Sequence, residues 1–358
     1  MSAPVRDHET DRTILIRTDA SPSIGIGHAM RCLSLAEAYR EAGGQGVFLM
    51  AEPTRAFGER ASSSGVEVRP MTGVPGSTED LAQTLAVADE VSAGWIVLDG
   101  YQFDGDFQAG FAACAARLLA LDDHGHARCY SADLVLNQNA GADESLYRDR
   151  RSGTQLLLGP RFALLREQFR RWPGSRKQAP SRARRVVVTF GGSDPDDVSG
   201  RVLEALGGVG GPLEVDLIVG PANPNRGALD VAAERCPHPI EVLVDVREMA
   251  ARLARADVAV AAAGVTALEL ARVGTPHIAI AIADNQRPGA LALARGGIVV
   301  DLGWHAEVTV EAIGAAIAAL VEDAPRRAEL SRRGQMLVDG RGAERVLAAM
   351  GLVAQPAL

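Results

Sequence analysis

The chain has 358 residues, 47% of them hydrophobic and 23% charged, which is typical of a globular protein with about two domains. Its formal net charge of −8 at pH 7 argues against a protein held to nucleic acid by its overall field. The four cysteines are widely separated, the first dozen residues lack the pattern of a signal peptide, and no apolar stretch of about 20 residues occurs, so we expect a cytoplasmic protein without stable membrane insertion.

Apolar runs that alternate with helical patterns predict a parallel α/β fold in the first half of the chain. Residues 13–19 have the pattern of a buried strand, and residues 28–41 that of a helix ending at Gly43 and Gly44. The pattern continues with strands at 47–50, 95–99 and 118–122, and helices at 78–89 and 106–116. In such folds ligands bind beyond the carboxyl ends of the strands, so a site is expected in the loops there.

A basic, polar stretch with two prolines, residues 170–185, shows no apolar periodicity and is predicted to link two domains. Beyond it the alternation restarts, with strands predicted at 185–190, 215–219, 240–244, 258–262 and 277–282. We therefore predict two doubly wound, Rossmann-like domains, residues 1–169 and 186–358, that face a cleft. A single large α/β sheet is the alternative.

The first candidate site is the glycine-rich loop between the first strand and the first helix. Gly25 and Gly27 let the backbone approach a ligand closely, and the free N–H groups of the helix start favour an anion. His28 projects from the first turn of that helix, at the carboxyl end of a strand, which indicates a catalytic rather than a surface histidine. Asp19 ends the strand and is expected to hold the other imidazole nitrogen of His28.

The same loop partly imitates a dinucleotide-binding fingerprint, with Glu52 after the second strand. Met30 occupies the third glycine position, however, and five residues separate Asp19 from Gly25, whereas the fingerprint begins directly after the strand. No P-loop sequence occurs either. We therefore expect neither an NAD site nor a P-loop ATP site, and no cofactor.

In the second half, the run Gly191-Gly192-Ser193-Asp194-Pro195 follows the strand predicted at 185–190. The glycine pair fits a tight turn or a close approach to a ligand. Ser193 or Asp194 is expected to cap a helix that Pro195 begins. An ordinary turn between a strand and a helix would need the same residue types, so this motif alone does not decide between ligand binding and structure.

Two further loops in the second half also carry residues suited to phosphate and sugar. Gly264 opens a helix whose start suits phosphate, and Thr266 adds a hydroxyl there. Glu269, one turn further, is placed to accept hydrogen bonds from a ribose diol or, alternatively, to complement the helix dipole. Asn285 and Gln286 supply uncharged donors and acceptors, although amides are also common in turns. Together these segments predict a nucleotide-diphosphate pocket built without a divalent ion.

The only cluster of residue types suited to metal is Asp122, Asp123, His124 and His126. Its spacing fits no zinc pattern closely, and a Mg²⁺ site or a solvated turn would both explain it. We expect no metal. Asp99 and Tyr101 end the preceding predicted strand and are expected to line the sugar side of the site.

As a set, these motifs resemble the UDP-sugar hydrolase family of pseudaminic acid biosynthesis and its relatives in spore-coat polysaccharide clusters. The matching residues follow in order over most of residues 13–304: Asp19-Ala20-Ser21, Gly25-x-Gly27-His28-x-x-Arg31-Cys32, Asp99-x-Tyr101, Asp122-Asp123, Asn137-Gln138-Asn139, Leu158-Gly159-Pro160-x-Phe162-Ala163-Leu164-Leu165-Arg166-x-x-Phe169, Gly191 to Pro195, and Asn285-Gln286. In fold, that family is similar to the lipid II-forming N-acetylglucosaminyltransferase of peptidoglycan synthesis. The resemblance thus implies the GT-B architecture of two Rossmann-like domains, with the C-terminal helix crossing back onto the first.

The resemblance implies metal-free removal of UDP from UDP-2,4-diacetamido-2,4,6-trideoxy-β-L-altropyranose, with His28 as the catalytic residue. It implies Glu269 at the ribose, Thr266 at the diphosphate and Asn285 near the phosphates, so that His28 faces Thr266 and Asn285 across the cleft. Val265 stands where the family often has a small hydroxyl residue, which removes one phosphate donor.

Candidate catalytic residues are thus His28, Asp19 and Tyr101, and the expected partner is a UDP-sugar. Three other functions would use the same motifs. They are a GT-B glycosyltransferase with a UDP-sugar donor, a hydrolysing epimerase and a non-catalytic nucleotide-sugar binding protein.

Overall fold

A computed structural model describes residues 13–20, 26–174 and 179–355. The chain forms two compact units. Unit 1 comprises Met1–Gln138, Ala142–Glu167 and Arg341–Leu358, and unit 2 comprises Asn139–Gly141 and Gln168–Gly340. Gly25 and residues 175–178 of the predicted linker lie outside the described residues.

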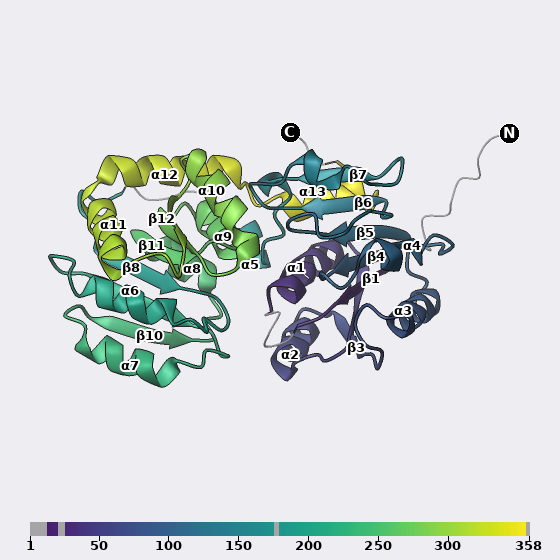
Figure 1. Cartoon of the computed structure of the whole chain (residues 1–358), viewed down its shortest axis with the longest axis horizontal. Helices are drawn as coiled ribbons and strands as arrows, with labels where there is room; N and C mark the ends of the chain where they lie inside the picture. Colours follow the sequence, from purple (N-terminus) through teal and green to yellow (C-terminus); the bar gives the residue numbers. More distant parts are fainter. Residues whose placement is uncertain (1–12, 21–25, 175–178, 356–358) are drawn as a thin grey trace. The chain divides into compact units, whose positions relative to one another are not determined.

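Unit 1 is built on a seven-stranded parallel sheet in the order β3-β2-β1-β4-β5-β6-β7 (Figure 1). Its strands are β1 (Thr13–Thr18), β2 (Gln45–Met50), β3 (Glu67–Pro70), β4 (Trp95–Asp99), β5 (Arg117–Leu121), β6 (Leu134–Asn137) and β7 (Gln155–Leu158). Its helices are α1 (Gly27–Glu41), α2 (Arg55–Ser63), α3 (Thr78–Glu90), α4 (Gly105–Ala109) and α13 (Gly342–Ala349), with short 3₁₀ turns η1 (Glu144–Tyr147) and η2 (Pro160–Phe162).

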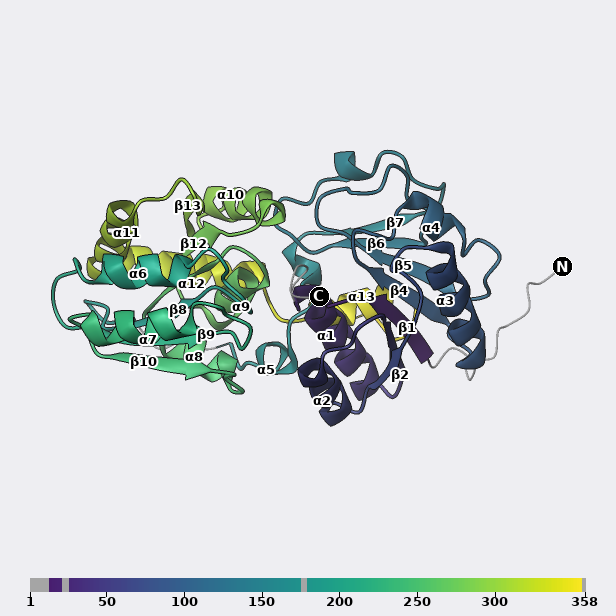
Figure 2. The same ribbon diagram turned by 60° about the horizontal axis from the view of Figure 1, so that its bottom comes forward.

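Both faces of this sheet are covered, which is why its central strands read as continuous apolar runs rather than as alternating ones. On one face, Ile16 packs in a core with Leu35 of α1 and Val346 of α13. On the other, Leu15 packs with Phe107 of α4. Figure 2 shows α13, in yellow, beside α1, with which it is in contact.

Unit 2 repeats this plan with a six-stranded parallel sheet in the order β10-β9-β8-β11-β12-β13. Its strands are β8 (Arg185–Thr189), β9 (Glu214–Val219), β10 (Ile240–Val244), β11 (Val258–Ala262), β12 (His277–Ala281) and β13 (Val300–Trp304). Its helices are α6 (Val198–Leu206), α7 (Arg226–Arg235), α8 (Met249–Arg255), α9 (Val265–Val273), α10 (Arg287–Arg295), α11 (Val310–Glu322) and α12 (Ala324–Leu337), with the turn η3 (Asp284–Gln286). The short helix α5 (Glu167–Arg170) spans the boundary between the units.

In both sheets the first strand lies between the second and the fourth, so the strand order reverses direction there. This doubly wound order creates a ligand crevice at the carboxyl ends of the two strands on either side of the reversal. The reversal lies between β1 and β4 in unit 1 and between β8 and β11 in unit 2. Two separate doubly wound sheets confirm the predicted fold class, and the single large sheet is excluded.

Several elements differ from those predicted. The helix predicted at 106–116 ends at Ala109, because Gly110 stops it and turns follow. Strands β3, β6, β7 and β13 and helix α2 were not predicted. Strand β3 carries two charged residues at the edge of the sheet, so it has no apolar run that would indicate a strand.

The C-terminal helix α13 lies inside residues 186–358, which were predicted to form the second domain, but it belongs to unit 1, as the resemblance implied. Two contacts attach it there. The indole Nε1 of Trp95 donates to the carbonyl oxygen of Met350 at 3.1 Å, just beyond the helix. Gly342 lies so close to η2 that a Cβ atom would approach the Ala163 carbonyl oxygen to 2.2 Å, so only glycine fits there.

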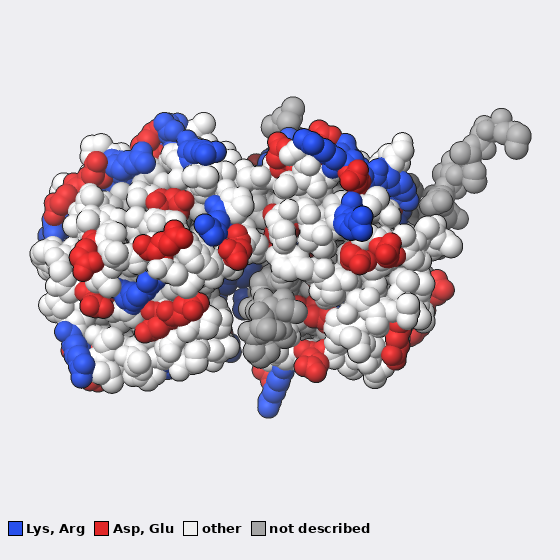
Figure 3. Space-filling view, viewed as in Figure 1, with Lys and Arg blue, Asp and Glu red and all other residues white. Residues whose placement is uncertain are grey.

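The surface gives no sign of a large single-sign field on the face drawn in Figure 3. Within each unit, basic and acidic side chains are interspersed on that face. Among the described residues, no helix has both the length and the apolar character needed to cross a membrane.

Candidate active site

Polar side chains converge at the carboxyl ends of β4 and β5 in unit 1. Asp99 ends β4 and is buried, with 1% of its surface exposed. The Nδ1 atom of His28 lies 2.6 Å from Asp99 Oδ1. Arg31 donates from Nε to Asp99 Oδ2 and from Nη2 to Asp99 Oδ1, both at 2.6 Å. His28 and Arg31 reach the same carboxylate because residues three apart on a helix share a face.

Asp123 and Tyr101 complete this group, which we call the His28 cluster (His28, Arg31, Asp99, Tyr101 and Asp123). Arg31 Nη1 donates to Asp123 Oδ1 at 2.7 Å, and the Tyr101 hydroxyl donates to Asp123 Oδ2 at 3.0 Å. The Tyr101 ring meets the His28 ring edge to face, with 5.2 Å between their centroids. The five side chains therefore form a closed ring of contacts. Tyr101 is the most exposed of them, at 40%.

The charge on Asp99 decides which nitrogen of His28 carries a proton in this contact. Burial alone would raise the pKa of Asp99, but the positive charge of Arg31 and the contact with His28 hold that pKa well below its usual range. Asp99 is therefore an ionised carboxylate that only accepts hydrogen bonds. Its 2.6 Å approach requires a proton on His28 Nδ1, so the 3.1 Å contact between that atom and Arg31 Nη2 joins two donors and is not a hydrogen bond. With the proton on Nδ1, the lone pair of the neutral imidazole lies on Nε2, the atom from which a general base would act.

Acid is expected to destabilise the protein through the buried carboxylates of this region. Folding lowers the pKa of Asp99, Asp122 and Asp123 from the usual 3.8, so below about pH 4 the unfolded chain binds more protons than the folded one. Their stabilising contribution is thus present above the unfolded value and lost as the pH falls through the folded ones. Urea unfolding at a series of pH values should show a loss of up to about 1.4 kcal/mol per pH unit for each carboxylate. Asp123→Asn should reduce the slope of unfolding free energy against pH by the contribution of one carboxylate. An unchanged slope would contradict the lowered pKa of Asp123.

Cys32 also lies against the cluster, and its Sγ donates to Asp99 Oδ2 at 3.3 Å. Burial, together with the negative charge of Asp99, raises the pKa of the Cys32 thiol well above its usual value. A neutral, buried thiol is a poor nucleophile. Cys32 therefore serves as a hydrogen-bond donor to Asp99.

Asp99, not Asp19, orients His28, which corrects the sequence-based assignment. The Asp19 carboxylate instead accepts from the backbone N–H of Ala51 at 2.8 Å and from Gln102 Nε2 at 3.1 Å, and it pairs with Arg17 at 2.8 Å. Asp19 directly follows β1, and Asp99 ends the neighbouring strand β4, but the Asp19 side chain is bound to Arg17 and to the loops after β2 and β4. In the sequence, the Asp99-x-Tyr101 motif was the signal that could have identified Asp99. That Asp99 is the partner of His28 depends on the pairing of β4 with β1.

Asp122 and His126, considered above as metal ligands, are occupied with each other and with their own loop. The Asp122 carboxylate accepts from the backbone N–H groups of His124, Gly125 and His126. It also accepts from His126 Nδ1 at 2.6 Å and from the hydroxyl of Tyr130. Burial alone would lower the pKa of His126, but the hydrogen bond and charge of Asp122 raise it above the usual value. In the described part of the chain, no group of three or more His, Cys, Asp or Glu side chains is arranged to hold a metal ion.

In unit 2, the Gly191–Pro195 run turns sharply at the carboxyl end of β8. Gly191 and Asp194 have positive φ angles of 81° and 42°. The Asp194 carboxylate accepts from the backbone N–H groups of Val198 at 3.0 Å and Ser199 at 2.9 Å, so it binds the start of α6 without being its N-cap residue. Pro195 does not begin that helix, since the turn continues to Asp197 and α6 starts at Val198. The N-cap residue is Asp197, not Ser193. Ser193 and Gly192 remain predicted ligand contacts at this turn.

The loops after β11 and β12 lie side by side, because these strands are neighbours in the sheet. Helix α9 follows Gly264, which is its N-cap residue. Glycine has no side chain, so Gly264 offers no side-chain hydrogen bond to the first N–H groups of the helix. The Gln286 amide lies next to Gly264, 3.3 Å from where a Cβ atom would stand, and its Oε1 accepts from the backbone N–H of Ile282. Thr266 lies in the first turn of α9, and Glu269 is buried in the next. Asn285 lies beside Gln286 in η3.

The candidate residues thus form two groups. His28, Asp99 and Tyr101 belong to unit 1, with Asp19 nearby, whereas Gly192, Ser193, Gly264, Thr266, Glu269, Asn285 and Gln286 belong to unit 2. Gly27 is the first residue of α1, directly before His28. That His28 faces Thr266 and Asn285 remains a prediction.

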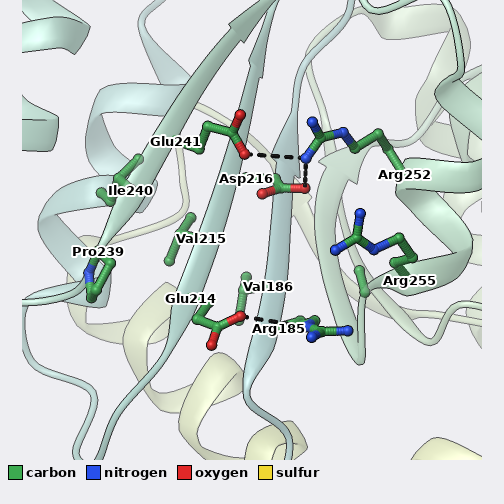
Figure 4. Close-up of a pocket in the computed structure, with 11 residues that line it drawn as sticks. Arg185, Val186, Glu214, Val215, Asp216, Pro239, Ile240, Glu241, Arg252 and Arg255 are labelled. Carbon is green, nitrogen blue, oxygen red and sulfur yellow. Dashed lines mark hydrogen bonds and ion pairs between the residues drawn. The ribbon is translucent and has the colours of Figure 1, made fainter.

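Unit 2 also has a separate hollow of about 370 Å³, drawn in Figure 4. It lies where β8, β9 and β10 begin, at the ends of the strands opposite to the loops described above. Three ion pairs lie among its charged side chains. Arg252 contacts Asp216 at 3.2 Å and Glu241 at 3.1 Å, and Arg185 contacts Glu214 at 3.4 Å. Because ligands of doubly wound sheets bind at the carboxyl ends of strands, we assign no part of the site to this hollow.

No family model matches the chain. Two curated proteins are similar in sequence. The uncharacterized protein MJ1062 of Methanocaldococcus jannaschii is 23% identical over 283 residues, which are 76% of this chain but only 56% of the archaeal protein. The spore coat polysaccharide biosynthesis protein SpsG of Bacillus subtilis is 25% identical over 245 residues, 66% of this chain and 69% of that protein.

Solved structures with the same fold span nearly the whole chain. MurG of Acinetobacter baumannii aligns with a TM-score of 0.65 and 15% identity over 96% of this chain and 100% of its own. Anabaena Alr3699/HepE, in complex with UDP and glucose, aligns with a TM-score of 0.64 and 14% identity over the same shares. At these identities the likeness shows the fold alone, and that fold is the predicted GT-B architecture.

Proposed function

We propose that the protein is a metal-independent UDP-sugar hydrolase in which His28 activates the attacking water. The observation that carries the proposal is the pairing of His28 Nδ1 with the ionised Asp99, which leaves Nε2 as the basic nitrogen. The motif order along the chain and the similarity to a spore coat polysaccharide biosynthesis protein support a nucleotide-sugar substrate.

In the proposed reaction, Nε2 of His28 accepts a proton from water as the water oxygen bonds to the anomeric carbon. The bond between that carbon and the β-phosphate oxygen breaks, and the electron pair leaves with UDP. The products are the free sugar and UDP, and a single displacement inverts the anomeric centre. Asp99 stabilises the imidazolium that forms, in the way a buried carboxylate supports a catalytic histidine.

Unit 2 binds the nucleotide in this proposal. The N-terminus of α9 at Gly264 and Thr266 receives the diphosphate, where N–H groups and the helix dipole favour negative charge. Asn285 and Gln286 donate uncharged hydrogen bonds to the phosphates, and Glu269 accepts from the ribose. These groups also stabilise the charge that develops on the leaving UDP, so no divalent ion is needed.

The substrate we propose is UDP-2,4-diacetamido-2,4,6-trideoxy-β-L-altropyranose or a close relative. We propose that the reaction takes place in the cytoplasm. A glycosyltransferase is the second candidate. Solved structures of the same fold favour it, because CalG4 is the calicheamicin glycosyltransferase and HepE was solved in complex with UDP and glucose. The two candidates differ only in whether water or an acceptor hydroxyl attacks the anomeric carbon.

One assay separates the candidates. The purified full chain is incubated with a panel of UDP-sugars, including UDP-diacetamido-trideoxy sugars and UDP-N-acetylglucosamine, with EDTA and without any acceptor, and free UDP is measured. Rapid UDP release from one sugar supports the hydrolase. Release that appears only after an acceptor is added supports the transferase, and UDP-sugar binding without turnover in either condition supports a binding protein. Loss of release in EDTA, restored by Mg²⁺, would refute the metal-independent mechanism.

Glu269→Gln is expected to weaken UDP binding by about 1–3 kcal/mol, because it removes the charged acceptor from the ribose hydroxyls. Isothermal titration calorimetry with UDP measures the change, and Glu269→Gln keeps the size of this buried side chain. Glu329, a partly exposed acid on α12 that pairs with Arg332, gives the control Glu329→Gln. Equal UDP affinity in both variants would remove Glu269 from the nucleotide site.

A further inference from the structure

Tyr101 is the most exposed residue of the His28 cluster. It follows the end of β4, is 40% exposed, and has its hydroxyl anchored on Asp123. This contact fixes one end of the side chain, so the orientation of the ring also depends on the groups that surround it. What surrounds the ring is a set of three imidazoles, from His28 at 5.2 Å, His124 at 5.0 Å and His126 at 5.5 Å between centroids.

These three imidazoles differ in how firmly they are held. His28 belongs to the proposed chemistry, and His124 is exposed. His126 is largely buried, with 9% of its side chain exposed. Its Nδ1 donates to Asp122 Oδ2 at 2.6 Å, and its Nε2 lies 3.4 Å from the carbonyl oxygen of Phe103. His126 is therefore fixed through Nδ1, and its Nε2 also donates to the Phe103 carbonyl oxygen when the ring is protonated.

The acceptor that holds His126 is itself fixed from several directions. Asp122 is 1% exposed and closes its own loop through the N–H groups of His124, Gly125 and His126. Two tyrosine hydroxyls, from Tyr130 and Tyr147, also donate to it. A fully satisfied buried network of this kind is rigid, since each member is held by its partners.

We propose that His126 is a positioning residue: the buried Asp122 carboxylate fixes the His126 ring, and that ring sets the orientation of Tyr101 beside His28. His126 touches neither His28 nor the reacting atoms and acts through Tyr101. The effect on turnover rests on the proposed function, whereas the effect on the Tyr101 ring does not.

The test compares His126→Asn with His124→Asn. The two substitutions lie in one loop and each removes an imidazole within about 5–6 Å of the Tyr101 ring, but only the first breaks the anchored support. Asparagine at 126 keeps an amide donor for Asp122, which also retains its backbone donors. We expect His126→Asn to lower kcat about 10- to 100-fold, the scale of a misplacement of roughly 1 Å, with KM and UDP affinity unchanged within about twofold. His124→Asn should change kcat less than about threefold.

A double-mutant cycle shows whether the effect passes through Tyr101. In a Tyr101→Leu background, His126→Asn should have almost no further effect on kcat, because the residue it positions is gone. Independent effects that multiply would overturn the proposal, as would equal losses from the two asparagine variants.

A spectroscopic readout keeps the proposal testable without turnover. The chain has four tyrosines, so 3-fluorotyrosine labelling yields few ¹⁹F signals, and Tyr101→Phe assigns the one of interest. His126→Asn should shift or broaden the Tyr101 signal, and His124→Asn should change it less. His126→Gln provides a second variant if the asparagine protein does not fold. An unchanged Tyr101 signal in folded His126 variants overturns the proposal. If the wild-type protein releases no UDP from any sugar, the proposed function fails while this readout still decides the role of His126.

Discussion

Replacing His28 by asparagine is expected to cut turnover by roughly 10²–10⁴ while UDP affinity stays within a few fold. The reason is that Nε2 of His28 is the only basic atom that the proposed mechanism requires, and the residues proposed to bind the nucleotide belong to the other unit. An asparagine amide still donates to Asp99, so the cluster keeps its hydrogen bond. Single-turnover release of UDP gives the rate, and calorimetry gives the affinity.

The opposite pattern would identify His28 as a packing residue. In that case His28→Asn lowers thermal stability and UDP affinity together and leaves turnover per bound complex nearly unchanged. A control is His238→Asn in unit 2, which removes a buried imidazole whose Nε2 lies 3.1 Å from the carbonyl oxygens of Leu206 and Val209. It should reduce stability and leave the turnover of the folded fraction at the wild-type value. A stable, UDP-binding His28→Asn protein with wild-type turnover would end the catalytic assignment.

Asp99→Asn is expected to have the largest effect on stability, a loss of about 3–5 kcal/mol in the free energy of unfolding. It removes the carboxylate that Arg31 contacts through two nitrogens and leaves that buried guanidinium with Asp123 alone. The folded protein should also lose turnover, because an uncharged amide no longer favours the Nδ1–H form of His28 or the imidazolium. Urea unfolding and UDP release measure the two effects separately.

Cys32→Ala is the matched control for this change. It removes only the weak thiol donor to Asp99 Oδ2 and preserves both charge pairs. Its stability loss should fall well below that of Asp99→Asn, and its turnover should remain close to wild type. If Asp99→Asn costs no more stability than Cys32→Ala, the carboxylate does not carry the charge balance of the cluster.

The identity of the carboxylate beside His28 shows where sequence reasoning stopped. Asp19 is close to His28 in the chain, and that proximity made it the expected partner. The structure pairs β1 with β4 and places Thr18 opposite Asp99, so a residue 71 positions away supplies the partner. Local spacing carries no information on which strands become neighbours, because strand pairing depends on how the whole sheet buries its apolar faces.

The Asp122-Asp123-His124-Gly125-His126 run illustrates the same limit. The residue types suit a metal ion, and the sequence contains nothing to show that Asp122 is used up. In the fold, Tyr130 and Tyr147 reach back to Asp122 from later loops, and the backbone of the turn donates to it as well. Adjacent aspartates therefore have separate roles, since Asp122 holds His126 while Asp123 joins Arg31 to Tyr101.

The sequence by itself determined the alternation of strands and helices, the two doubly wound halves, and the loops that carry the candidate site. These features follow from hydrophobic periodicity and from glycine and capping residues, which act over a few neighbouring residues. Tertiary structure alone decided that Asp99 orients His28 and that Asp122 supports a loop, and it confirmed the return of α13 to the first unit that the resemblance implied. Each of these depends on contacts between residues far apart in the chain, which form only when the sheet order and helix packing are complete.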